Sequence, residues 1–418
     1  MSALANPVFR RLFAAQVLAL LGTGLATVAL GLLAYRLAGA EAGTVLGVLL
    51  AIKMTAYVLV APVVTAVAAR VPTRAFLVSM DGLRAVVAGV LPLVDALWQV
   101  YALVVLLQVA AAAFTPTYQA TVPAVLTEER DYTQALSLSR LAFELEALLS
   151  PVLAAGLLLV LTPVELFFGT ALGFLASALL VAGSVLPRKE IRRGRTGGFR
   201  TFLGTPALRA LLGLNLATAA GGALVLVNTV VLVRDRFGGT AVAVAVALGC
   251  YGAGSVLAAL VLPRALRALS DRAVLLGGGS VLAGTLGLGT LWFALAPGLT
   301  ALLVLWAVLG AAGAVVQTPV GRLVRRSGSP DGWAGLFAAQ FTLSHAAWLV
   351  TYLIAGLLGP GPLTFAVLGG LAALGVLFAV RAWPPVRRHY CGRHHGRLLA
   401  EPRARRVPDP GQRVVRGQ

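Results

Sequence analysis

Cysteine is scarce in this chain, in which only Cys250 and Cys391 occur among 418 residues. Two cysteines exclude a disulfide framework and allow at most one bridge. Cys250 falls in an apolar segment that we expect to span a membrane, and Cys391 falls in a basic segment that we expect in the cytoplasm. Neither place favours oxidation, so we predict that both are free thiols.

Charge is also scarce, at 12% of residues against roughly 25% in soluble domains. Hydrophobic residues make up 59% of the chain, and the mean hydropathy is +0.90. These values predict a polytopic membrane protein. A spanning helix needs about 20 apolar residues, so the chain has room for about a dozen spans and for no soluble catalytic domain.

The motifs of ATP hydrolysis and of hydrolytic catalysis are missing. The sequence contains no Walker A loop, no nucleophile elbow and no HExxH helix. We therefore expect neither an ATP-driven pump nor an enzyme, and we expect no bound cofactor.

Long apolar runs bounded by charge, proline and glycine predict an all-α protein with twelve transmembrane helices. The first run follows Arg10 and Arg11, and it is too long for a signal-peptide core, so we predict an uncleaved first helix. The predicted spans are 12–34, 43–68, 75–94, 100–122, 134–161, 166–186, 210–233, 241–262, 273–295, 299–320, 334–358 and 363–381.

Basic residues outnumber acids by 34 to 15, and their placement predicts the topology. Arg36, Arg234 and Arg236 fall in loops on one side, and most of the other basic residues fall on the opposite side. The positive-inside rule then places both termini in the cytoplasm, which we take to be that of a bacterium, with the protein in its inner membrane.

A basic connection divides the predicted spans into six and six. We expect an N-terminal bundle at 1–186, a basic cytoplasmic linker at 187–207, a C-terminal bundle at 208–383 and a disordered basic tail at 384–418. The linker and tail are expected to contact anionic lipid, and without interleaved aromatic residues they do not favour nucleic-acid binding. We expect a monomer with a substrate route between the bundles near the midplane.

Several motifs resemble those of the major facilitator superfamily, and in particular of its exporters. The connection Arg70-Val-Pro-Thr-Arg74 and the following Asp81-Gly-Leu-Arg84 resemble the loop between helices two and three. The segments Pro116–Pro123, Gln134–Arg140 and Leu149–Pro151 resemble the junction of helices four and five in macrolide and siderophore exporters. The resemblance implies the major facilitator fold and small-molecule export by alternating access. The first glycine, the acid and the second glycine of the family loop are replaced here by Thr65, Ala69 and Pro72, while Arg70 and Arg74 remain.

A narrower resemblance is to nickel-resistance exporters of the superfamily, and it rests on residues 21–35 and 50–57. Those proteins carry a histidine-rich tail, whereas the tail of this chain has only His389, His394 and His395 beside Cys391. With His345, these residues are the candidate metal ligands, because imidazole suits nickel and zinc.

The span 134–161 carries Arg140, Glu144 and Glu146, although a charge deep in a bilayer costs on the order of 3 kcal/mol. Arg140 and Glu144 are about 40° apart around a helix and can pair, while Glu146 lies about 160° from Glu144. We therefore expect one acid to face a central cavity and the other to pack against a neighbouring helix. Lys53 needs an acidic partner, for which Glu144 and Glu146 are the candidates. The alternatives are proton coupling through either acid and a static salt bridge.

The remaining polar residues form two predicted sets. Asp81 and Arg84, with Arg70 and Arg74, are expected to form a cytoplasmic gate. The set expected to line the substrate cavity is Gln119, Asn215, Asn228, Gln340 and His345.

The sequence thus predicts a proton-coupled efflux antiporter. Its favoured substrate is a divalent metal cation such as nickel, and the alternative is an amphipathic organic compound of macrolide, drug or siderophore type. A membrane receptor that does not transport is the competing class.

Overall fold

The computed structural model describes residues 3–38, 42–68, 70–162, 164–187, 197–295 and 298–383. Residues Met1–Trp383 form one compact unit. Every regular element in the described ranges is helical. The described part of the protein is therefore all-α, as the long apolar runs predicted.

Within the described residues, six long helices make up the first half of the unit. Their starts follow local signals: the Asn6 side chain accepts hydrogen bonds from the backbone N–H groups of Val8 and Phe9 at 3.0 and 3.1 Å, which caps the first helix. The helices are α1 (Pro7–Ala38), α2 (Ala42–Ala68), α3 (Thr73–Val90), α4 (Leu97–Val125), α5 (Glu129–Leu157) and α6 (Leu166–Ala182).

The second half also has six long helices, together with two short ones. Proline occupies the first turn of two of them, α8 and α14, where its missing N–H costs nothing. The long helices are α8 (Pro206–Val231), α9 (Ala241–Ala268), α10 (Asp271–Leu295), α11 (Leu299–Gln317), α13 (Trp333–Leu358) and α14 (Pro362–Ala382), and the short ones are α7 (Gly198–Gly204) and α12 (Val320–Arg326).

Each predicted span overlaps one long helix. Within the described residues, nine helical segments are long and apolar enough to cross a membrane, so the number twelve stays a prediction. The charged helix α5 is not among the nine. It begins at Glu129, five residues before the predicted span, because Glu129, Arg130 and Asp131 extend the helix beyond its apolar part.

Small residues bring pairs of helices into backbone contact within the second half. Gly213 of α8 lies directly against Gly375 of α14, and Gly254 of α9 lies against Ala307 of α11. Because glycine has no Cβ, two helix backbones can approach closely enough for extensive van der Waals contact in a membrane. We infer that these two pairs give the second half its rigidity.

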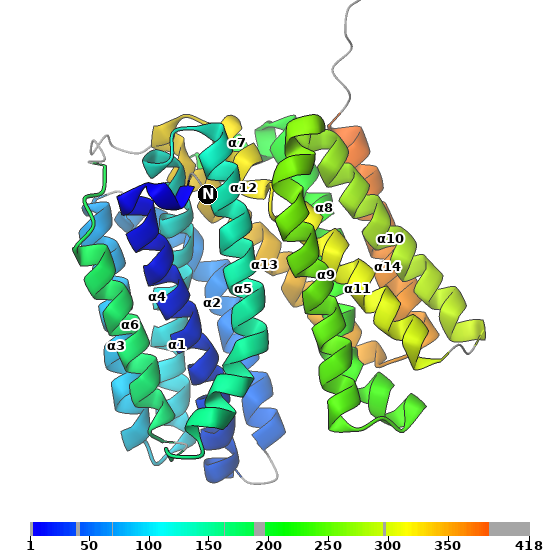
Figure 1. The fold of residues 1–418 in the computed structure, drawn as a ribbon, viewed down its shortest axis with the longest axis horizontal. Coiled ribbons are helices and arrows are strands. Elements are labelled where there is room, and N and C mark those ends of the chain that lie inside the picture. Colours follow the sequence, from blue (N-terminus) through cyan, green and yellow to red (C-terminus); the bar gives the residue numbers. More distant parts are fainter. Residues whose placement is uncertain are drawn as a thin grey trace, which may run out of the picture. The chain divides into compact units, whose positions relative to one another are not determined.

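The two halves meet through a few helices only. Helix α13 packs against α2 and α4, and α5 packs against α9 and α12. In Figure 1 the two sets of helices lie close together at the end that carries the N-terminus, and their ribbons separate toward the opposite end. We call the end at which the two halves lie close together the closed end.

Candidate functional site

A cavity of about 740 Å³ lies between the two halves. Its lining comes from α1 to α5 on one side and from α8, α11, α12 and α13 on the other. It extends from Tyr132 and Gly321, at the closed end, to Leu30 and Leu49 near the opposite end of the helices. Most of the lining is apolar, with isolated polar and charged groups, as in sites for amphipathic organic ligands.

The structure brings most of the predicted cavity residues together. Gln119, Asn215, Gln340 and His345 all line the cavity, whereas Asn228 is buried elsewhere in α8. The Asn215 and Gln340 amides form a reciprocal pair, with N–H···O distances of 3.2 and 3.0 Å. This pair satisfies the polar groups of both amides at the wall between α8 and α13.

Helix α5 holds its two acids on different faces, as their spacing predicted. Glu144 forms an ion pair with Arg140 and accepts a hydrogen bond of 2.7 Å from Ser255 of α9. Arg140 also donates to the Gln317 side chain of α11 at 3.0 Å. Glu144 is 8% exposed and Ser255 is fully buried, so this network ties α5 to the second half.

Glu146 is the acid that lines the cavity. Ser150, one turn further along α5, donates a hydrogen bond of 3.3 Å to the Glu146 carboxylate. The backbone of Gly24 in α1 lies against both side chains, and a Cβ at this position would be 2.6 Å from Glu146 Oε1 and would overlap Ser150. The missing side chain of Gly24 therefore makes the space that Glu146 occupies.

Replacing Gly24 by alanine should displace the Glu146 and Ser150 side chains and destabilise the protein by about 1–3 kcal/mol, the usual cost of overpacking. The control is Gly31→Ala in the same helix, because a Cβ there meets no atom within 4 Å. Thermal unfolding of the purified variants would measure the difference. Equal stability of the two variants would contradict the close packing around Glu146.

Lys53 lines the same cavity and lies beside a cluster of rings. Its ammonium group is 5.8 Å from the centroid of the Tyr57 ring. Tyr57 contacts Phe341 and His345 of α13, with ring centroids 5.0 and 4.8 Å apart. Lys53 interacts electrostatically with Glu146, but it forms no ion pair with any residue in the described ranges.

Asp81 and Arg84 form an ion pair of 2.9 Å within the first half. Asp81 is fully buried and accepts a hydrogen bond of 2.6 Å from Ser177 of α6. The Arg84 guanidinium lies 4.1 Å from the Phe174 ring centroid and also faces the cavity. Arg84 also donates a hydrogen bond of 3.3 Å to Thr23 of α1. These contacts connect α3 to α6 and α1 within the first half, while Arg70 and Arg74, near the start of α3, are exposed.

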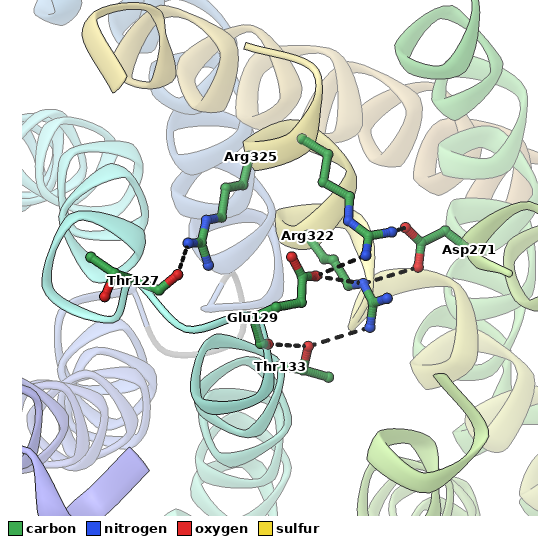
Figure 2. Close-up of polar contacts among 7 residues, drawn as sticks. Thr127, Glu129, Thr133, Asp271, Arg322 and Arg325 are labelled. Atoms are coloured by element: carbon green, nitrogen blue, oxygen red, sulfur yellow. Dashed lines mark hydrogen bonds and ion pairs between the residues drawn. The ribbon is translucent and has the colours of Figure 1, made fainter. Parts of the chain in front are cut away.

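Ion pairs join the two halves at the closed end (Figure 2). Arg322 of α12 contacts Glu129 of α5 at 2.8 Å and Asp271 of α10 at 3.1 Å. Arg326 contacts the same two acids at 3.3 and 2.6 Å. We call Glu129, Asp271, Arg322 and Arg326 the charge latch.

Two further contacts support the charge latch. Arg325 donates a hydrogen bond to the backbone carbonyl of Thr127, which immediately precedes α5. The backbone of Gly321 lies against Tyr132, because a Cβ there would be 2.8 Å from the Tyr132 hydroxyl. The latch is thus a different set of residues from the gate that the sequence suggested.

Some site residues were not singled out from the sequence. Ser255 and Ser150 are single hydroxyl groups in apolar runs, and Gly24 is one of 47 glycines, so no local pattern distinguishes them. The arginines of α12 were assigned only to topology, and their RxxxR spacing was the available signal. The tail residues His389, Cys391, His394 and His395 lie outside the described residues. In the described ranges no three His, Cys, Asp or Glu side chains form a group that could hold a metal ion.

The family model of the Major Facilitator Superfamily matches residues 12–288, which is more than half of the chain. The chain belongs to the major facilitator superfamily. No curated protein sequence gives a significant match.

Solved superfamily transporters have a similar fold. The crystal structure of the human organic anion transporter MFSD10 (TETRAN) has a TM-score of 0.72 and 16% identity, covering 89% of this chain and 98% of that one. A bacterial homologue of the iron transporter ferroportin, in an outward-facing state, has a TM-score of 0.68 and 16% identity, covering 89% and 97%. The structure of such a homologue with soaked iron has a TM-score of 0.69 and 15% identity, covering 89% of this chain and 97% of that one. The protein is thus a multi-pass membrane protein with a transporter fold.

Proposed function

We propose that this superfamily member is a secondary transporter that exports an amphipathic organic compound by alternating access. The observation that carries the proposal is the cavity of about 740 Å³ between the two halves, which is lined by apolar and aromatic groups with a few charges. Such a cavity suits a ligand with a large apolar surface and one polar end. The charge latch closes one end of it.

Alternating access requires the closed end to open when the other end closes. The latch contains two arginines and two carboxylates. Its contacts between the halves are ion pairs, which can break and form again. Separating the halves exchanges the two ion pairs of Glu129 for water, because Asp271 and both arginines belong to the second half. We propose that the latch end faces the cytoplasm of a bacterial cell, in agreement with the positive-inside distribution of basic residues.

We further propose Glu146 as the group that binds and releases a proton during transport. Among the described residues it is the one carboxylate in the cavity lining, whereas Glu144 is paired with Arg140 and Ser255 and does not belong to the lining. A carboxylate that alternates between water-filled and closed states of a cavity meets the requirement for a proton carrier. Glu144 then serves as a fixed connection between α5 and α9.

A divalent metal cation is the second candidate substrate. The presence of Glu146 and His345 in the same cavity favours it. The Nδ1 atom of His345 is 2.7 Å from the Phe341 carbonyl oxygen. That contact fixes the ring and leaves Nε2 as the nitrogen that could bind a metal. However, Lys53, Arg84 and Arg140 face the same space and would repel a cation.

The proposed proton role predicts different effects for the two acids of α5. Glu146→Gln should abolish the dependence of substrate flux on a pH gradient in everted membrane vesicles, because glutamine cannot carry the proton. Glu144→Gln keeps the hydrogen bonding and should retain the dependence. Flux that responds equally to the gradient in wild type and in Glu146→Gln would disprove the role of Glu146.

Resistance profiling of a sensitive strain that expresses the chain would separate the candidate substrates. Protection against organic compounds but not against nickel or cobalt is the expected result. Protection against the metals alone would favour the second candidate. Absence of both phenotypes, with no flux in vesicles, would favour a receptor that does not transport.

A further inference from the structure

The charges around the cavity are arranged with the cations inward. Lys53, Arg84 and Arg140 line the cavity, whereas Asp81 and Glu144, the carboxylate partners of the two arginines, do not belong to the lining. Each arginine pair is neutral as a whole, but its positive member is nearer to a bound ligand. Against these three cations the described lining sets one carboxylate, that of Glu146.

Lys53 is the cation that is available to a ligand. The guanidinium groups of Arg84 and Arg140 are already held by carboxylates, and Arg140 also donates to Gln317. Lys53 has no ion-pair partner among the residues that the structure describes, and its closest acidic neighbour in the lining is Glu146. An ammonium group without a bonded carboxylate in an apolar cavity is a docking point for an anion.

Flat apolar surface adjoins Lys53. The Tyr57 ring, which lies below the ammonium group, contacts both Phe341 and His345 from the opposite half. Phe341 and His345 are themselves 4.1 Å apart between ring centroids. A ligand that places its charge at Lys53 can therefore stack an apolar or aromatic part on rings from both halves.

We propose that the cavity binds an amphipathic organic anion whose charged group docks on Lys53, and that Glu146 is protonated in the same complex. The inference rests on the proposed function and specifies its substrate class and the sense of its coupling to protons.

The charge balance of the cavity determines whether the proton moves with the substrate or against it. Without substrate, ionised Glu146 compensates Lys53 and the cavity is neutral. With the anion on Lys53, the cavity is neutral only when Glu146 has taken up a proton from solution. Enclosing an uncompensated charge inside a membrane protein is costly. The two neutral forms of the cavity are therefore the ones in which the protein changes from facing one side of the membrane to facing the other. The anion and the proton are then carried in the same direction, which differs from the exchange that the sequence suggested.

Lys53 of α2 and Glu144 of α5 act electrostatically on Glu146, and Ser150 of α5 donates a hydrogen bond to it. Further charged or titratable groups of the cavity lining are Tyr57 of α2, Arg84 of α3, Arg140 of α5 and His345 of α13, while α1 contributes the backbone of Gly24. Arg84 and Arg140 keep their own carboxylates. Lys53 is therefore the cation whose compensation changes when the anion binds.

The test uses the purified full-length chain and three probes with the same ring system. Naphthalene-1-sulfonate is an anion that does not cross membranes as a neutral acid, 1-naphthylmethylammonium is a cation, and 1-naphthalenemethanol is uncharged. Calorimetric titration should give the tightest binding for the sulfonate. Lys53→Gln should weaken sulfonate binding by roughly 10- to 100-fold, as expected for loss of a hydrogen bond to a charged group. Lys53→Arg should largely restore it.

Proton uptake supplies the second readout. Calorimetric titrations in buffers of different ionisation enthalpy count the protons that the protein takes up when it binds the sulfonate. At neutral pH we expect the uptake of close to one proton in wild type and of close to none in Glu146→Gln. Because Glu146→Gln mimics the protonated acid, it should bind the sulfonate at least as tightly as wild type.

The outcomes separate the two proposals. Preferred binding of the cation, unchanged sulfonate affinity in Lys53→Gln, or proton release on sulfonate binding would overturn the anion inference while leaving the transporter proposal in place. If none of the three probes binds at millimolar concentration, the amphipathic cavity itself is wrong and the proposed function fails with it. A thermal unfolding curve that matches wild type shows that each variant is folded.

Discussion

Replacing Arg322 by glutamate should open the end of the protein that the charge latch closes. Arg322 is 9% exposed and contacts both Glu129 and Asp271, so the substitution would place three acids together. Removing one partner of a buried ion pair costs about 3–5 kcal/mol. Glu129 keeps 41% side-chain exposure, so we expect the lower end of this range. Because the ion pair with Glu129 is the one that crosses between the halves, its loss and the repulsion that replaces it shift the protein from the closed toward the open form.

Spin labels on the two halves at the latch end would measure the change as a longer interhalf distance. Substrate flux should fall at least about tenfold, because a transporter that cannot close this end completes no cycle. The matched control is Arg326→Glu, since Arg326 contacts the same acids but is 46% exposed at its side chain, and its effect should be smaller. Adding Glu129→Arg to Arg322→Glu should restore part of the closure. An unchanged distance in Arg322→Glu would show that the latch does not hold the halves together.

The fold class followed from composition, and the arrangement of α5 followed from spacing. Residues four apart on a helix share a face, so the pairing of Arg140 with Glu144 and the separation of Glu146 were both predictable. Which acid faces the cavity was not predictable, because it depends on the rotation of α5 relative to α9. Ser255 decides that rotation in the structure by bonding to Glu144.

The latch shows a different limit of sequence reasoning. Glu129, Asp271 and Arg322 each occur at a helix end beside other charges, where an ordinary solvated position is the simplest interpretation. They act together only because the ends of α5, α10 and α12 converge. Conversely, Asp81 and Arg84 resembled a family gate, but in the structure their contacts connect α3 to α6 within one half.

Replacing Glu144 by alanine should cost more stability than replacing Glu146, the other acid in the apolar part of α5. The substitution leaves Arg140 in a part-buried site whose other partners, Ser255 and Gln317, are neutral. It also removes the acceptor of the Ser255 hydroxyl, which is fully buried. An unpaired buried charge costs about 3–5 kcal/mol, and chemical denaturation of the purified protein should show a loss of about 3 kcal/mol.

A double substitution separates the ion pair from the helix contact. Arg140→Met combined with Glu144→Leu removes both charges, and its stability should recover much of the loss, because an apolar pair of similar volume often replaces a buried ion pair without cost. Glu146→Ala is the control, since its side chain faces the cavity and should change stability little. If Glu144→Ala and Glu146→Ala were equally stable, Glu144 would not be a fixed connection between α5 and α9. The assignment of the proton to Glu146 alone would then lose its structural basis, because both acids would be free to titrate.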